Sequence, residues 1–168
     1  MKTYKEALLV LIPTLVIFAG IIWLATPTPK SAEQANLSAS VSGALVVKEA
    51  NNYDFGTISM AKGKVSHLYS VKNNSAEPIT VNTAYTSCMC TSAILIMDGT
   101  RKGPFGMAGH GFLPKVNQVI PAGKEFQVEA VFDPAAHGPA GVGLIERSVT
   151  LETSSGVVEM LFSATVTP

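Results

Sequence analysis

The sequence predicts an all-β fold, an immunoglobulin-like antiparallel β-sandwich of about seven strands, preceded by one transmembrane α-helix. Three observations support this prediction: an uncharged apolar stretch near the N-terminus, an alternation of apolar and polar residues after residue 44, and clusters of turn-forming residues between the alternating segments. Alternation with a period of two is typical of antiparallel strands that are buried on one face. Six or seven short strands over residues 44–168 fit one sandwich with a single core.

The apolar stretch, residues 7–25, contains no charged residue. As a helix it would be about 28 Å long, which matches the hydrocarbon core of a bilayer. Lys2 and Lys5 precede it, and positive charge is retained on the cytoplasmic side, so we expect a cytoplasmic N-terminus and an exported C-terminal domain. A cleaved signal peptide is the alternative, but its apolar region is usually only 7 to 15 residues long.

The segment that follows, residues 26–43, is rich in Pro, Ser, Thr and Ala and has no sustained apolar period, so we interpret it as a flexible linker. The folded domain is then residues 44–168. The chain has a formal net charge of zero, which argues against nucleic acid as a partner. Charged residues make up only 14% of the chain, against about 25% in typical soluble domains. Depletion of charge is a property of protein interfaces.

The alternating segments are separated by Asn, Ser, Pro and Gly residues at 73–78, 121–124 and 154–156, which are typical of turns. Each of the six segments places apolar side chains on one face and polar side chains on the other. They are Leu45–Lys48, Lys64–Asn73, Ile79–Tyr85, Phe126–Phe132, Ile145–Glu152 and Val158–Val166.

Five short motifs occur in an order that carries a family resemblance. They are Tyr53-Asp54-Phe55-Gly56-Thr57-Ile58, Val71-Lys72-Asn73-Asn74 with Pro78-Ile79, Thr86-Ser87-Cys88-Met89-Cys90-Thr91, Ile120-Pro121-Ala122-Gly123 and Val131-Phe132-Asp133-Pro134. Over residues 46–166 the chain resembles the bacterial exported domain-of-unknown-function family fifteen-seventy-three, which is similar to ASH, major-sperm-protein and hydin domains. The resemblance implies an exported sandwich of seven to eight strands, of a type used for binding or scaffolding, with no activity attached. Two departures are Met89, where the family usually has glycine, and the longer stretch 92–117.

The Cys88-Met89-Cys90 motif is the candidate for chemistry, and three interpretations remain open. Two cysteines in an exported protein normally oxidise, and a disulfide across one residue of an extended strand would be strained, which suits thiol-disulfide exchange. Reduced thiolates together with methionine and histidine would suit Cu(I). The third interpretation is a packed or oxidised pair without chemistry. We therefore expect no cofactor, with copper as the alternative, held by Cys88, Cys90, Met107, His110 and His137.

A long glycine-rich loop is predicted over residues 98–117. It has no GxxxxGK[ST] motif, so nucleotide binding is not expected. Glycines with interspersed aromatic and methionine side chains are typical of an adaptable docking loop. The predicted partner-binding residues are Arg101, Phe105, Met107, His110 and Phe112, with His137 on a second segment, 133–143.

The expected strand order predicts which of the candidate site residues lie close together. In an immunoglobulin-like order, Met60, the cysteine pair, the long loop and residues 133–143 would lie at one end of the sandwich. No G-x-S-x-G motif is present and the paired carboxylates fall on outward strand positions, so we do not expect an enzyme. The sequence therefore predicts a single-pass protein of the bacterial inner membrane whose periplasmic domain is an accessory or structural subunit of a larger membrane complex, such as a respiratory or photosynthetic one. The alternative is a periplasmic copper-binding or thiol-redox protein. The partner and the state of the cysteines are left open.

Overall fold

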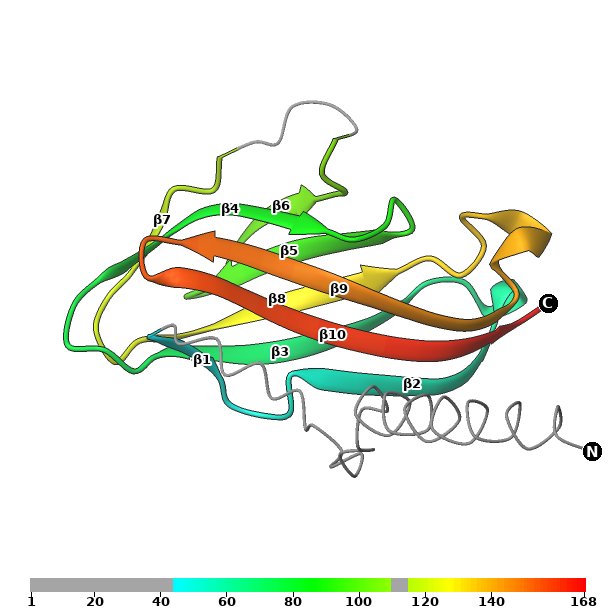
Figure 1. Ribbon diagram of the computed structural model, residues 1–168, viewed down its shortest axis with the longest axis horizontal. Helices are drawn as coiled ribbons and strands as arrows, with labels where there is room; N and C mark the ends of the chain where they lie inside the picture. Colours follow the sequence, from blue (N-terminus) through cyan, green and yellow to red (C-terminus); the bar gives the residue numbers. More distant parts are fainter. Residues whose placement is uncertain (1–43, 110–114) are drawn as a thin grey trace, which may run out of the picture. The chain divides into compact units, whose positions relative to one another are not determined.

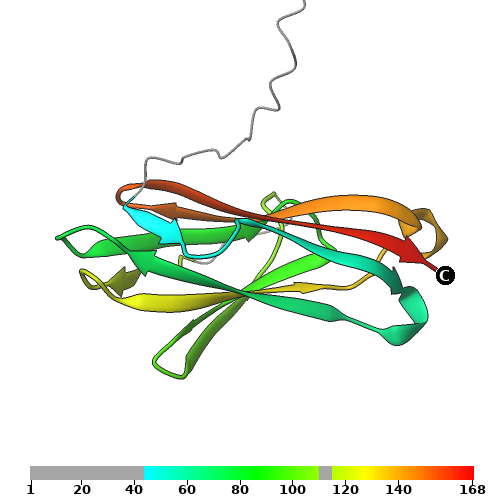
Figure 2. The ribbon, with the colours of Figure 1, turned by 90° about the horizontal axis from the view of Figure 1, so that it is seen from below.

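The computed structural model describes residues 44–109 and 115–168, which form two β-sheets packed face to face (Figure 1). In the view from below, the layer containing the two C-terminal strands lies over the layer containing the central strands of the chain (Figure 2). The predicted transmembrane helix 7–25, the predicted linker 26–43 and residues 110–114 lie outside the described residues. Among the described residues, no helix is both long enough and apolar enough to span a bilayer.

Ten strands make up the two sheets of the described part. In chain order they are β1 (Leu45–Val47), β2 (Asn52–Ser59), β3 (Val65–Asn73), β4 (Ile79–Thr86), β5 (Thr91–Met97), β6 (Thr100–Phe105), β7 (Gln118–Ile120), β8 (Glu125–Phe132), β9 (Gly143–Thr153) and β10 (Gly156–Thr167). One sheet has the order β1-β3-β8-β5-β6 and the other β2-β10-β9-β4-β7. All neighbours are antiparallel except β2 and β10, which are parallel. The all-β sandwich prediction is confirmed.

Every segment with clear alternation forms a strand, whereas β2, β5, β6 and β7 were not predicted. Strand β2 is mostly exposed at a sheet edge, so it lacks an apolar stripe. The expected loop 98–117 differs most from the structure, because it begins with β6, which pairs with β5. Strand β6 contains Gly103 and Pro104, residues that usually weaken a strand prediction but are tolerated at a sheet edge.

Aromatic side chains join the two sheets through the core. Phe162 of β10 contacts Phe132 of β8 and Phe55 of β2, each with ring centroids 5.6 Å apart. The Tyr69 hydroxyl on β3 donates a hydrogen bond of 2.5 Å to the Leu161 carbonyl on β10, so a polar group crosses the core with its partner satisfied. Burial raises the pKa of this hydroxyl above its ordinary value, which keeps it a donor.

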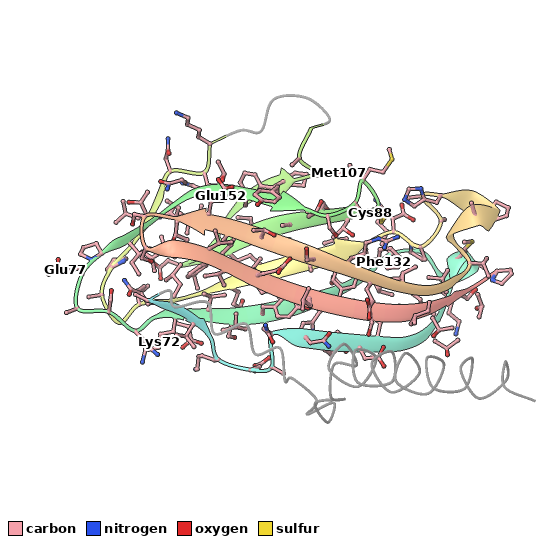
Figure 3. The ribbon with its side chains drawn as sticks, viewed as in Figure 1. Lys72, Glu77, Cys88, Met107, Phe132 and Glu152 are labelled. Atoms are coloured by element: carbon pink, nitrogen blue, oxygen red, sulfur yellow. A yellow bond between two sulfur atoms is a disulfide. The ribbon has the colours of Figure 1, made fainter. Side chains whose placement is uncertain are left out.

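The two ends of the sandwich differ in structure. The cysteine end carries the turn at residues 87–90 and two 3-10 helices, η1 (Met60–Lys62) and η2 (Gly138–Gly141). The hairpin end carries the β9–β10 turn and residues 74–78. Ala44, where the linker would join the domain, lies at the hairpin end because its carbonyl accepts a hydrogen bond from the Asn74 amide. Figure 3 shows the two ends well separated, with Cys88 at one and Glu77 at the other.

His67 is a half-buried packing residue. Because its pKa differs between the folded and unfolded states, we expect the stability of the domain to depend on pH. Its ring stacks on Tyr53 at 3.6 Å, and burial lowers the pKa of His67 below its ordinary value of 6.5, against the opposing effect of Glu49. The unfolded chain therefore binds the proton more readily than the folded domain. The stabilisation is fully present above about pH 6.5 and is lost as the pH falls through the folded-state pKa.

The expected result is that His67→Gln reduces the loss of stability between pH 7.5 and pH 5. Urea unfolding at the two pH values measures it for both proteins. An equal loss in the variant and the parent protein would contradict the assignment of this acid sensitivity to His67.

Candidate functional site

The cysteine pair lies in the turn between β4 and β5, and its two sulfurs form a disulfide with a Cα–Cα distance of 5.3 Å. The expectation of a strained bridge assumed an extended strand. In the turn, the Cα atoms come within the separation of ordinary disulfides, about 4.4–6.8 Å. Because residues 87–90 form a turn, Cys88 and Cys90 can bond to each other across Met89. Two cysteines at the same spacing in an extended strand could not do so without distortion of the backbone.

Hydrogen bonds fix this turn to both sheets. The Ser87 amide donates to the Ser148 carbonyl at 3.0 Å, and the Ser87 hydroxyl accepts from the Ser148 amide at 2.8 Å, which attaches the turn to β9. The Cys90 carbonyl accepts from the Asp133 amide at 2.9 Å, which attaches it to the end of β8. The Thr86 hydroxyl donates to the Cys88 carbonyl at 3.0 Å. The two sulfurs are thus held in a preformed position.

His137 reaches the first sulfur from the segment between β8 and β9. Its Nε2 lies 3.2 Å from Cys88 Sγ. The Asp133 carboxylate accepts from the Ala135 amide at 3.0 Å and starts a turn, and Gly138 follows His137 with a φ of +55°, a conformation that favours glycine. The chain therefore folds back and brings the imidazole next to Cys88 Sγ, at the end of the sandwich where the predicted strand order had placed residues 133–143.

Arg147 reaches the second sulfur from β9. Its Nε donates to Cys90 Sγ at 3.4 Å, and its Nη1 donates to the Glu146 carbonyl at 2.7 Å. Arg147 was not predicted as a site residue from the sequence. A signal was present, because Arg147 falls on the same stripe of its strand as Ile145 and Val149, which are buried. A guanidinium on an inward stripe needs a partner, and here that partner is the sulfur and a carbonyl.

Two depressions flank the cysteine pair. The larger, of about 670 Å³, is lined by His137 and Arg147 together with Val142 and Leu144. Leu144 is 74% exposed, which is unusual for a leucine on a strand. The smaller, of about 210 Å³, is lined by Cys90, Met89, Lys64 and Asp133 among others, and Met89 is 64% exposed. Exposed apolar side chains of the described part therefore lie on both sides of the sulfur pair.

The other predicted site residues do not form one cluster. Met107 forms a bridge with Thr86 and so lies beside the cysteine turn, and Figure 3 shows it on that side of the molecule. Phe105 is buried in the core, so its side chain is not available to a partner. Arg101 pairs with Glu129 and lies opposite Ile96, near the end of β5 that is remote from the cysteines. His110 and Phe112 are outside the described residues.

The donor set fits a soft metal ion in part. One ligand atom from each of Cys88, Cys90 and His137 lies within 4.8 Å of the others. Thiolate and imidazole ligands suit Cu(I) and Zn²⁺, but the sulfurs are bonded to each other in this state and must be reduced first.

Part of the chain matches a known protein family. Residues 46–104 match the model of the family described as Protein of unknown function (DUF1573). This confirms part of the resemblance expected over 46–166. No curated protein matches the sequence.

Comparison with solved structures shows the fold. A protein of unknown function from Porphyromonas gingivalis W83 is similar at 12% identity with a TM-score of 0.53 over 73% of this chain, and this chain covers 46% of that one. A human ASH/PapD-like domain of CEP192 is similar at 9% identity, covering 74% and 86% of the two chains with a TM-score of 0.44. The periplasmic chaperone SfaE is similar at 10% identity, covering 74% and 57% with a TM-score of 0.37. Only the similarity to the Porphyromonas gingivalis protein is strong enough to support a conclusion, and that conclusion is the sandwich fold alone.

Proposed function

We propose that this chain is a non-catalytic accessory subunit of a larger bacterial membrane complex, anchored by residues 7–25, with its sandwich in the periplasm as a protein-binding module. The observation that supports this most is the exposure of Val142 and Leu144, which line one depression at the cysteine end, with Met89 exposed in the second depression beside Cys90. Exposed large apolar side chains at one end of a domain are typical of interaction sites. The low proportion of charged residues and the formal net charge of zero favour a protein partner over nucleic acid.

The position of the linker supports the choice of this end. Ala44 lies at the hairpin end, so the predicted linker joins the domain at the end opposite the cysteine turn. The turn at residues 87–90 is held by hydrogen bonds to β9 and to the residue after β8, so the surface around it is preformed. A preformed surface loses little conformational entropy on binding.

Charge substitutions at the two ends test the proposal. Leu144→Asp is expected to reduce the amount of co-purified partner at least about tenfold, because a carboxylate in the centre of an apolar interface loses its hydration without a partner. Val157→Asp, at an exposed position of the hairpin end, is the matched control and is expected to leave co-purification unchanged. Both full-length variants would be extracted in mild detergent and the bound proteins identified. Unchanged co-purification with Leu144→Asp would contradict the proposal.

A second candidate function is chemistry at the cysteine pair, favoured by the 3.2 Å contact between Cys88 Sγ and His137 Nε2. Replacing both cysteines by serine separates the two candidates. Loss of function with the assembly intact would favour chemistry, and unchanged function would favour a scaffold.

A further inference from the structure

We infer that the reduced Cys88-Met89-Cys90 turn and His137 form a three-coordinate Cu(I) site. This inference rests on the second candidate function and makes it specific. The three ligand atoms come from two segments far apart in the chain, the β4–β5 turn and the segment between β8 and β9. They lie within 4.8 Å of one another in the disulfide-bonded state. A contact between two such segments is a property of the fold rather than of local sequence.

The ligand number and softness point to Cu(I) rather than Zn²⁺. Structural zinc sites are almost always four-coordinate, and the cluster in the described part offers three ligands and no fourth Cys, His, Asp or Glu. Two thiolates and one imidazole satisfy the lower coordination number that Cu(I) accepts, and thiolates select soft ions. The nearby carboxylate of Asp133 is paired with Lys64 at 3.7 Å and is a hard ligand.

Access to the sulfurs also favours a small ion over a mixed disulfide with another protein. Cys88 is 9% exposed and Cys90 3% exposed. Exchange through a mixed disulfide requires a second sulfur to approach along the line of the existing bond, and access limits its rate. A single ion can reach Cys90 from the smaller depression, which Cys90 lines, and His137 from the larger one.

Arg147 has a defined part in this site. Two thiolates and one Cu(I) ion carry a net charge of −1, and the guanidinium next to Cys90 Sγ compensates that charge. The Glu146 carbonyl holds the guanidinium in place through Nη1. Arg147 is therefore a positioning and charge-compensating residue, while the three ligands bind the ion.

The site forms in two steps, reduction of the disulfide and binding of Cu(I), and each step conserves atoms, electrons and charge. A small-molecule dithiol, which needs less access to the sulfurs than a protein does, transfers two electrons and two protons to the disulfide; this yields two thiols and leaves the reductant as a disulfide. The two thiols then bind one Cu(I) ion together with neutral His137 and release two protons, so the total charge is conserved.

Competition with a chromogenic Cu(I) chelator tests the inference on the full-length protein in detergent, reduced with a dithiol and freed of reductant under anaerobic conditions. The reduced protein is expected to retain one Cu(I) per chain and the oxidised protein none. Replacing Cys88 and Cys90 by serine should abolish retention, and His137→Ala should weaken affinity at least about tenfold. His67→Ala removes a histidine outside the site and should have no effect. Arg147→Gln should weaken affinity while leaving the stoichiometry at one.

Several results would overturn the inference. Retention by the reduced protein no greater than by the double serine variant would do so, as would equal affinity in His137→Ala and the parent. Rapid reduction of a model disulfide without copper retention would replace the inference by thiol exchange. Co-purification of the partner with the double serine variant is a separate readout, so failure of the copper site and failure of the docking proposal can be told apart.

Discussion

Replacing Phe162 by alanine is expected to lower the free energy of unfolding by about 3–5 kcal/mol, the usual cost of removing a buried phenylalanine ring. Phe162 is 1% exposed and lies between the sheets, where it contacts Phe55 of β2 and Phe132 of β8. Loss of the ring leaves a cavity that rigid strands on both sides cannot close. The effect is expected to be this large because β2 is an edge strand in which no residue is fully buried, and Phe55 contacts the ring of Phe162.

Urea unfolding followed by circular dichroism measures this effect. Thr165→Ala is the matched control, since Thr165 is exposed on the same strand and its change is expected to cost less than about 1 kcal/mol. A loss below about 1 kcal/mol for Phe162→Ala would show that the core does not depend on contact between the two sheets at this ring.

Replacing Asn73 by leucine is expected to cost about 2–4 kcal/mol, through unsatisfied polar groups rather than through lost volume. Asn73 is 0% exposed. Its Nδ2 donates to the carbonyls of Glu77, Ile120 and Pro121 at 2.8, 3.0 and 3.2 Å, and its Oδ1 accepts from the Ser75 amide and hydroxyl. One side chain therefore joins the end of β3 to the next turn and to β7.

Two variants separate this explanation from simple packing. Asn73→Asp keeps the acceptor for Ser75 but loses the three donations, so it is expected to be destabilising as well. Asn74→Ala, at the exposed neighbouring position, is expected to be nearly neutral. Thermal unfolding ranks the three proteins, and a leucine variant as stable as the parent would contradict the role of the network.

The alternation of apolar and polar residues predicted the strands that have one face in the core and the other face exposed to solvent. Strand β8 is an example, because Phe126, Val128, Ala130 and Phe132 are buried and alternate with more exposed residues. Strand β6 could not be predicted in this way, since it is an edge strand containing glycine and proline and is recognised only by its pairing with β5. The parallel pairing of β2 with β10 joins residues about 109 positions apart and has no local signal.

The part of the candidate site that follows from strand order was predicted from the sequence, and the part that depends on local backbone conformation and side-chain contacts was not. The strand order placed residues 133–143 near the cysteines, and His137 contacts Cys88 as a result. The turn at residues 87–90 was not predicted, because two cysteines separated by one residue give no sign of the backbone conformation between them. Arg147 was overlooked because an inward arginine was treated as part of a strand pattern rather than as a group that needs a partner.

Site-specific photocrosslinking in intact cells tests most directly the claim that the cysteine end binds a protein partner. A photoreactive residue is placed at Leu144 in one full-length variant and at Val157, at the hairpin end, in another. We expect a discrete crosslinked protein from position 144 and none from position 157. Crosslinking from position 157 alone, or equally from both positions, would contradict the account.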